Sequence, residues 1–281
     1  MAHANDQITV RKQVDRLFKQ AREEKKLNTD FSSLKPIQLD ALGYAVIRRK
    51  HILAIAPTGS GKTIIVTAAA VLLDVLNANT PGEHPKKLSK LLLICPLVSL
   101  VTDITNQLQK WGISVTALKD TTPGMFSEAA LGEHISVVVG SPEHIADPKW
   151  RTIFSEVWKP DFISIDEIWL AFAWSSFRAY TKSNMLWLCS NLEKATFIFV
   201  TATFSDESFK QLLDTFEIER HEIRVIFKSP DVPNLYLGFL KYKWPSSEVS
   251  VDTLDMNLKW VLEIVTHPDG PKTLILIIAQ K

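Results

Sequence analysis

The residues with the most specific chemical meaning lie in the segment 56–63, which reads APTGSGKT. An apolar run, residues 52–56, precedes the loop, and a helical pattern, residues 64–76, follows it. In this setting glycines let the backbone curl, so that N–H groups and the helix N-terminus face a phosphate. We therefore predict a phosphate-binding loop, although Ala56 stands where the general pattern has glycine. Its expected nucleotide-binding residues are Thr58, Gly59, Ser60, Gly61, Lys62 and Thr63.

Two adjacent carboxylates, Asp166 and Glu167, form the second group that could do chemistry. They follow the apolar run 162–165, and a strand-end aspartate is where a nucleotide hydrolase holds Mg²⁺, beside a glutamate that can activate water. Two acids after an apolar run also suit a helix N-terminus, so the pair takes its meaning from the loop upstream. Together the two segments predict a site for ATP and Mg²⁺. Thr63 and Asp166 are the expected metal ligands, and Lys62, Asp166 and Glu167 are the expected catalytic residues.

Apolar runs that could be strands recur along the chain, and helical stretches lie between most of them. This alternation predicts an α/β fold with a doubly wound, mainly parallel sheet and helices on both faces. Ligands of such sheets bind beyond the carboxyl ends of the strands, which is where both chemical segments fall. The strand candidates are residues 52–56, 91–95, 135–139, 162–165, 197–201 and 223–227.

The composition is that of an ordinary soluble globular protein, with 281 residues of which 46% are hydrophobic and 22% are charged. A net charge of +1 gives no overall attraction to nucleic acid, so a binding face would have to be a local patch. No apolar run is long enough to span a bilayer, and the N-terminus lacks a signal-peptide core. The two cysteines show no metal-ligand spacing. We expect a nuclear or otherwise intracellular protein without a membrane partner; its oligomeric state is left open.

Several short segments extend the pattern in a fixed order around the loop and the two acids. They are residues 34–38, 95–100, 141–143, the aromatic run 174–180, 201–203 and 233–235. As an ordered set, these segments resemble the first motor lobe of a superfamily 2 helicase, and more narrowly the RecQ family of DNA helicases. The resemblance covers nearly everything from residue 31 to residue 281. It implies a RecA-like lobe of the P-loop NTPase class.

The resemblance implies adenine recognition before the loop and nucleic-acid coupling after the acids. Gln38 would hydrogen-bond adenine, for which an amide has both a donor and an acceptor, and Lys35 could lie over the base. Trp174, Phe177 and Arg178 would couple strand binding to ATP hydrolysis. Aromatic rings stack on unpaired bases, and arginine adds charge and a cation–π contact. An exposed glutamine at a helix start and a core aromatic cluster are the alternative interpretations.

Four hydroxyl-bearing residues complete the implied nucleic-acid face. Ser99 and Thr102 would donate to DNA phosphates, unless Ser99 only caps a helix. Thr201 and Thr203 would link the nucleotide site to the DNA face, or would only end a strand. One position departs from the family, because Trp169 stands where the family's Asp-Glu-Ala-His motif has histidine. Tryptophan has one donor and no acceptor, so it cannot replace both functions of that histidine, whereas metal binding and water activation should survive.

We expect three segments: an N-terminal helical extension (1–30), a RecA-like ATP-binding lobe (31–230), and a linker with the start of a truncated second lobe (231–281). The family's arginine finger lies beyond these motifs, so the chain alone should bind ATP weakly and hydrolyse it poorly. The implied function is a 3′–5′ helicase motor acting on single-stranded or partly duplex DNA in repair or recombination, with RNA as an open alternative. A non-catalytic module that binds ATP and nucleic acid is the main competing hypothesis. A P-loop kinase or small-molecule ATPase would not need the aromatic run.

Overall fold

The computed structural model describes residues 2–80, 88–96, 98–127, 134–173, 179–192 and 194–229. These residues belong to one compact unit, Met1–Asp231. The second unit, Val232–Lys281, lies outside the described residues, and so do the predicted linker and the start of a second lobe.

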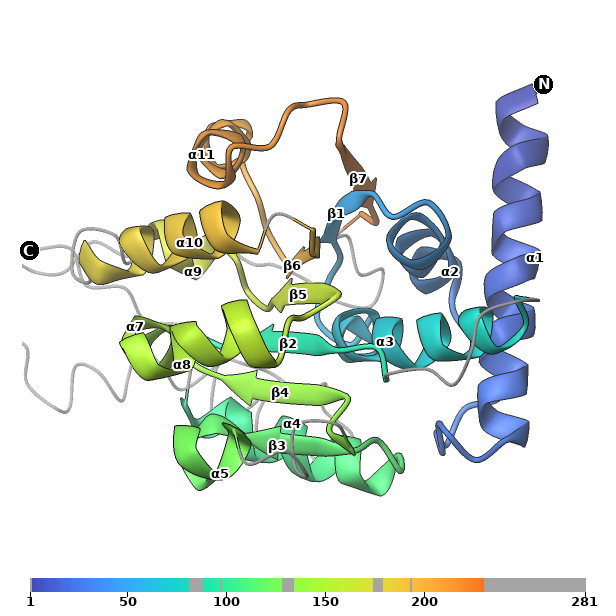
Figure 1. Ribbon diagram of the computed structural model, residues 1–281. Helices are drawn as coiled ribbons and strands as arrows, with labels where there is room; N and C mark the ends of the chain where they lie inside the picture. Colours follow the sequence, from blue (N-terminus) through green and yellow to red (C-terminus); the bar gives the residue numbers. More distant parts are fainter. Residues whose placement is uncertain are drawn as a thin grey trace, which may run out of the picture. The chain divides into compact units, whose positions relative to one another are not determined.

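Strands and helices alternate along the described chain (Figure 1). The strands are β1 (His51–Ile55), β2 (Leu91–Ile94), β3 (Val115–Ala117), β4 (Val137–Gly140), β5 (Phe162–Ile165), β6 (Thr196–Thr201) and β7 (Ile223–Phe227). The longer helices are α1 (Ala2–Glu23), α2 (Pro36–Leu42), α3 (Lys62–Ala78), α4 (Val98–Lys110), α10 (Ala179–Asn191) and α11 (Asp206–Phe216). Shorter helical segments are η1 (Gly43–Ile47), η2 (Leu118–Asp120), α5 (Pro123–Ser127), α7 (Pro142–Ala146), α8 (Pro148–Thr152), η3 (Ile153–Val157) and α9 (Trp169–Ala173).

The strands form one sheet in the order β3-β4-β2-β5-β6-β1-β7, and all of the described pairings are parallel. Ile52 of β1, for example, is in register with Ile198 of β6 on one side and Arg224 of β7 on the other. The predicted doubly wound α/β fold is therefore confirmed. Strand β3 was not predicted, because three residues at the edge of a sheet are too few to show a period.

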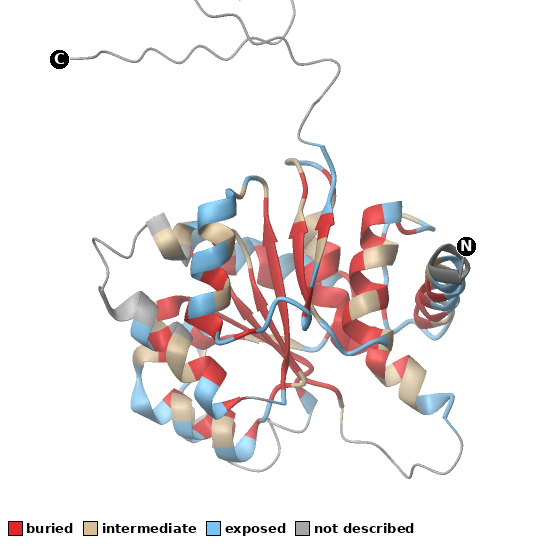
Figure 2. Cartoon of the chain, turned by 90° about the horizontal axis from the view of Figure 1, so that it is seen from above, coloured by how far each residue is buried: buried red, intermediate tan, exposed pale blue. Residues whose placement is uncertain are grey.

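Helices cover both faces of the sheet, and each face has its own hydrophobic core. Successive side chains of a strand point to opposite faces, so Ile52 and Ala54 enter the core formed with α1, α2, α3 and α4. Leu53 enters the other core, to which α10, α11 and η3 contribute. The central strands are buried, whereas exposed residues occur on the outer surfaces of the helices and on the edge strand β7 (Figure 2). This double coverage explains why the strands read as continuous apolar runs.

Helix α1 is part of the first core. Its residues Val14, Leu17, Phe18 and Ala21 are buried in the same cluster as the apolar side chains of α3. The guanidinium of Arg11 donates from Nε to Oδ1 of Asp40 at 2.5 Å and from Nη2 to Oδ2 at 2.6 Å. This two-point contact ties α1 to α2, which carries Gln38. None of the described helices is long and apolar enough to cross a bilayer.

Candidate functional site

The predicted phosphate-binding loop connects the carboxyl end of β1 to the first residue of α3. It starts beside β6, because the N–H of Ala56 donates to the carbonyl of Thr201 at 2.9 Å. Gly59 and Gly61 have φ values of 76° and 83°, which glycine adopts without the strain of a side chain. A Cβ on Gly61 would lie only 2.4 Å from Nε2 of Gln38. The backbone conformation therefore favours glycine at position 61, and a side chain there would also displace the amide of Gln38.

Three side chains bind the carbonyl groups of this loop. Gln38 donates from Nε2 to the carbonyl oxygens of Gly61 at 3.0 Å and Ser60 at 3.4 Å, and its Oε1 accepts from the N–H of Lys35 at 2.7 Å. The ammonium of Lys35 reaches the carbonyl of Gly59 at 3.2 Å. The ammonium of Lys62 reaches the carbonyl of residue 56 at 3.2 Å. The carbonyl oxygens of the loop are thus held by Lys35, Gln38 and Lys62.

The donor groups of the loop are left available. The N–H groups of Gly59 and Gly61 have no acceptor among the residues that the structure describes. The hydroxyl of Ser60 is buried and has no hydrogen-bond partner there either. Thr63 lies in the first turn of α3, where backbone N–H groups face outward. Oriented donors at a helix N-terminus are the chemistry that binds a phosphate, so this loop fits the predicted ligand.

The two predicted acids lie opposite the loop, at the carboxyl end of β5. The N–H of Asp166 donates to the carbonyl of Ile94 on β2 at 3.0 Å. The ammonium of Lys62 lies 3.8 Å from Oε1 of Glu167, so the loop and the acids form one site. Glu167 has a φ of 44°, a left-handed conformation that non-glycine residues adopt infrequently. This turn directs the glutamate toward Lys62, and the backbone strain is the kind found at functional sites.

The environment of Asp166 disfavours a negative charge. Burial and, secondarily, the neighbouring charge of Glu167 raise the pKa of Asp166 to about 6. The N–H of Glu167, which donates to Oδ1 of Asp166 at 3.0 Å, and the charge of Lys62 oppose this rise. A divalent cation beside the carboxylate would favour its ionised form. The described residues contain no cluster of three acid, histidine or cysteine ligands.

Trp169 contacts Glu167 directly. Its indole N–H donates to Oε2 of Glu167 at 3.2 Å, and the N–H of Ala202 approaches the same oxygen at 3.4 Å. The hydroxyl of Thr201 lies 3.3 Å from that oxygen and 2.9 Å from the carbonyl of Thr203. One hydroxyl proton cannot serve both acceptors, and the shorter contact favours Thr203. The tryptophan at the family's histidine position therefore uses its single donor on the candidate general base.

Of the predicted nucleic-acid residues that the structure describes, Ser99, Thr102 and Thr203 are exposed, whereas Thr201 is buried. Ser99 is exposed and lies inside α4 rather than before its first residue, so it does not have the capping position of the alternative interpretation. Thr102 is exposed, and its hydroxyl accepts from the ammonium of Lys119 at 2.7 Å. Sequence reasoning missed Lys119, because a residue in η2 that is 17 positions away gives no local signal. The remaining predicted residues, Trp174, Phe177 and Arg178, lie outside the described residues.

The fold and the site define a RecA-like nucleotide-binding lobe. The family model for "DEAD/DEAH box helicase" matches residues 35–212, which is more than half of the chain. The chain belongs to this helicase family. The matched segment begins at Lys35, which donates to the carbonyl of Gly59, and ends within helix α11.

Relatives and solved structures agree with this assignment. ATP-dependent DNA helicase Q1 of Rattus norvegicus is 30% identical over 121 residues, which cover 41% of this chain and 17% of the relative. DEAD-box helicase Mss116, bound to ssRNA and UDP-BeF, has a TM-score of 0.55 at 16% identity, covering 73% of this chain and 42% of Mss116. DUF1998 helicase MrfA, bound to DNA and AMPPNP, has a TM-score of 0.53 at 19% identity, covering 76% of this chain and 29% of MrfA. The chain spans less than half of each of these proteins, and the two structural likenesses establish the fold.

Proposed function

We propose that this chain is the ATP-binding lobe of a RecQ-like DNA helicase, in which ATP hydrolysis drives 3′–5′ movement along a DNA strand. One observation carries the proposal. A glycine loop with available N–H donors faces two strand-end acids, and Lys62 lies between them, 3.8 Å from Glu167. Membership of the helicase family supports the reading of this site as one for ATP rather than for another phosphate.

Each residue of the site has a role in this chemistry. The N–H groups of the loop and the ammonium of Lys62 would bind the phosphates of ATP. Thr63 and Asp166 would hold Mg²⁺, which when bound neutralises the phosphate oxygens during transfer. Glu167 would accept the proton of the attacking water, and Trp169 and the N–H of Ala202 fix the orientation of its carboxylate.

Gln38 has to exchange partners before it can read adenine. Its amide donates to the carbonyl of Gly61 and accepts from the N–H of Lys35, so both ends are used within the protein. Adenine recognition would release at least one of these contacts. Since Gln38 also holds the loop, this exchange would let base recognition alter the position of the phosphate-binding backbone.

DNA is the proposed strand, bound by Ser99 and Thr102 together with the aromatic run, while Thr201 and Thr203 would link the nucleotide site to the DNA face. The ammonium of Lys119 lies at this surface and adds a charge for the backbone phosphates. The resemblance to RecQ and the rat DNA helicase favour DNA, whereas Mss116 was bound to ssRNA. RNA is therefore the second strand to test.

The proposal is tested by the dependence of ATP hydrolysis on a strand. We expect single-stranded DNA to stimulate turnover, and Arg178→Ala to reduce this stimulation without lowering the affinity for a fluorescent ATP analogue. Lys62→Ala is the control that should weaken nucleotide binding itself. Equal loss of stimulation and of nucleotide affinity in Arg178→Ala would contradict the assigned coupling role. Nucleotide binding without any turnover would favour the non-catalytic module. Stronger stimulation of turnover by RNA than by DNA would identify RNA as the bound strand.

Trp169 offers a test of how the candidate base is oriented. Trp169→Phe should lower the turnover number several-fold, because Glu167 loses a charge-assisted hydrogen bond worth about 1–2 kcal/mol at a partly exposed position. The KM for ATP should change little, since Trp169 contacts the base and not the loop. Trp169→His should restore turnover, because it returns a ring N–H. An unchanged turnover number in Trp169→Phe would show that the indole contact has no part in catalysis.

A further inference from the structure

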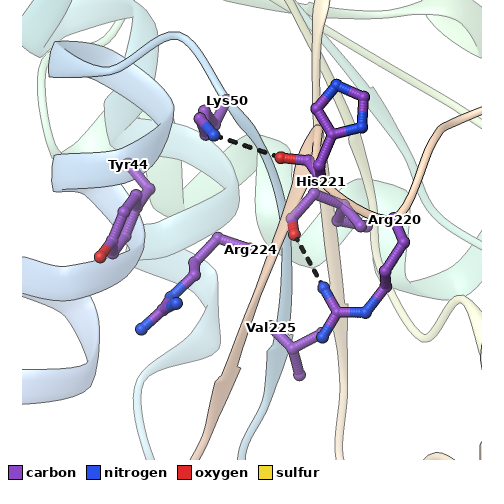
Figure 3. A pocket seen from close by; sticks show the side chains of 7 residues that line it. Tyr44, Lys50, Arg220, His221, Arg224 and Val225 are labelled. Atoms are coloured by element: carbon purple, nitrogen blue, oxygen red, sulfur yellow. Dashed lines mark hydrogen bonds between the residues drawn. The ribbon is translucent and has the colours of Figure 1, made fainter.

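A concave region lies at the opposite end of β1 from the phosphate-binding loop. Its cavity, of about 270 Å³, is lined by Tyr44, Lys50, Arg220, His221, Ile223, Arg224 and Val225 (Figure 3). Lys50 precedes β1 and His221 precedes β7, so this β7 pocket lies at the amino ends of the strands. The five residues of β1 correspond to about 16 Å of strand, which makes the β7 pocket separate from the nucleotide site.

The β7 pocket is a cationic site rather than a site for an apolar ligand. It is somewhat smaller than the roughly 300–1,000 Å³ of a typical small-molecule cavity, and most of its lining side chains are polar or charged. Three of them, Lys50, Arg220 and Arg224, carry permanent positive charge at neutral pH, and none of the lining residues is acidic. The chemistry of this lining therefore favours an anion.

Most of the donors in the β7 pocket are not used by the protein. Lys50 donates to the carbonyl of His221 at 3.2 Å, which leaves two of its three ammonium protons. Arg220 donates once, from Nη1 to the carbonyl of Ile223 at 3.3 Å, out of five N–H donors. Within the described part of the chain, neither residue takes part in an ion pair. Lys50 and Arg220 therefore keep both charge and donors for a ligand.

Arg224 is the most available of the three cations. Its guanidinium carbon lies 5.1 Å from the centre of the Tyr44 ring, and this contact orients the group beside the cavity (Figure 3). Among the described residues it has no hydrogen-bond acceptor and no ion-pair partner. The acid two positions before it, Glu222, is not among the lining residues, and its Oε2 accepts from the N–H of Glu219 at 2.9 Å. A planar guanidinium with free donors matches the geometry of a phosphate.

We propose that the β7 pocket binds a backbone phosphate of the nucleic-acid strand, beyond the surface next to the nucleotide site. The inference rests on the proposed function for the presence of a nucleic acid. Because the net charge of the chain is only +1, attraction to a polyanion has to come from local groups such as these. A free phosphate offers the same chemistry, so the experiment separates the two sources.

The test compares long and short strands in variants of the β7 pocket. Arg224→Gln and Lys50→Gln should each weaken binding of a single strand of about 30 nucleotides roughly tenfold, but not that of a strand of about six nucleotides, which one groove can hold. The slope of log affinity against log salt should fall by about 0.7 for each phosphate that the variant no longer neutralises. Lys110→Gln, at an exposed cation that ends α4, is the matched control and should change neither. Circular dichroism and affinity for an ATP analogue should match the wild type.

The outcomes separate this inference from the proposed function. An unchanged salt slope in Arg224→Gln, or an equal loss in Lys110→Gln, would overturn the pocket as a strand contact. A titration with inorganic phosphate tests whether the amide resonances of Ile223 and Val225 shift. If they do, and Arg224→Gln still binds the long strand with wild-type affinity, the pocket is a free-phosphate site. If the pocket variants bind the long strand as tightly as the wild type while ATP binding is normal, only the pocket inference fails and the proposed ATP site stands. If the wild-type chain proves unable to bind ATP but still binds the long strand through Arg224, the result would support the pocket and contradict the motor function.

Discussion

Glu167→Gln is expected to slow ATP hydrolysis by about 100-fold or more, because a neutral amide cannot accept the proton of the attacking water. Glutamine keeps the size of the side chain, and its carbonyl oxygen can still accept from the indole of Trp169 and the N–H of Ala202. Nucleotide affinity should therefore stay close to that of the wild-type chain. The loss belongs to the chemical step.

A single-turnover measurement of phosphate release, with nucleic acid present, isolates that step. The control is Glu156→Gln, which removes an exposed carboxylate in η3 on a different part of the surface and should leave the rate unchanged. A wild-type rate in Glu167→Gln would mean that another group activates the water. Weakened ATP binding with a normal chemical rate would assign Glu167 to ligand binding.

Asp166→Asn should have two opposite effects: a more stable protein and the loss of Mg²⁺-dependent nucleotide binding. The surroundings raise the pKa of Asp166 from its ordinary 3.8 to about 6, so the folded protein at pH 7 carries a charge that its site disfavours. Removal of that charge should raise the free energy of unfolding by about 1–3 kcal/mol at pH 7. The same change removes a metal ligand, so ATP should no longer bind more tightly when Mg²⁺ is added.

The pH dependence follows from the sign of the pKa shift. A carboxyl group with a raised folded pKa contributes stability while it is protonated, and that contribution is lost as the pH rises through about 6. The advantage of Asp166→Asn over the wild type should therefore be largest at pH 7 and shrink toward pH 5. Urea unfolding at both values measures it, with Asp214→Asn as the control for an acid on α11 away from the site. A variant less stable than the wild type at pH 7 would show that the carboxylate is favoured in the folded protein.

The sheet was predictable because its central strands β1, β2, β5 and β6 are buried and read as apolar runs of four to six residues. The phosphate-binding loop was predictable because its backbone has positive φ at positions 59 and 61. Glycine favours that conformation, and the glycines can be read directly in the sequence. Strand β3 escaped prediction, since its register with β4 and not its own pattern makes it a strand.

The details of the site depend on contacts between distant residues, which a single sequence does not reveal. The family resemblance connected Gln38 to nucleotide binding. Its hydrogen bonds to the carbonyls of the loop join residues more than 20 positions apart, so the sequence did not predict them. The contact between Trp169 and Glu167 depends on the left-handed backbone conformation of Glu167. A glutamate gives no sequence signal for that conformation. The β7 pocket combines residues from η1, from the segments just before β1 and β7, and from β7 itself, and they form no local motif.

The packing of α1 has a practical consequence for anyone who prepares this protein. The family match begins at residue 35, yet the buried side chains begin at Val10 and continue through Phe18 and Ala21. Expression of the matched segment alone would remove the apolar side chains of α1 that pack on α3. The apolar surface of α3 that this exposes would favour aggregation. Removal of α1 would also leave Asp40 without the guanidinium that steadies it, two residues from Gln38. A well-behaved recombinant fragment should keep the first helix.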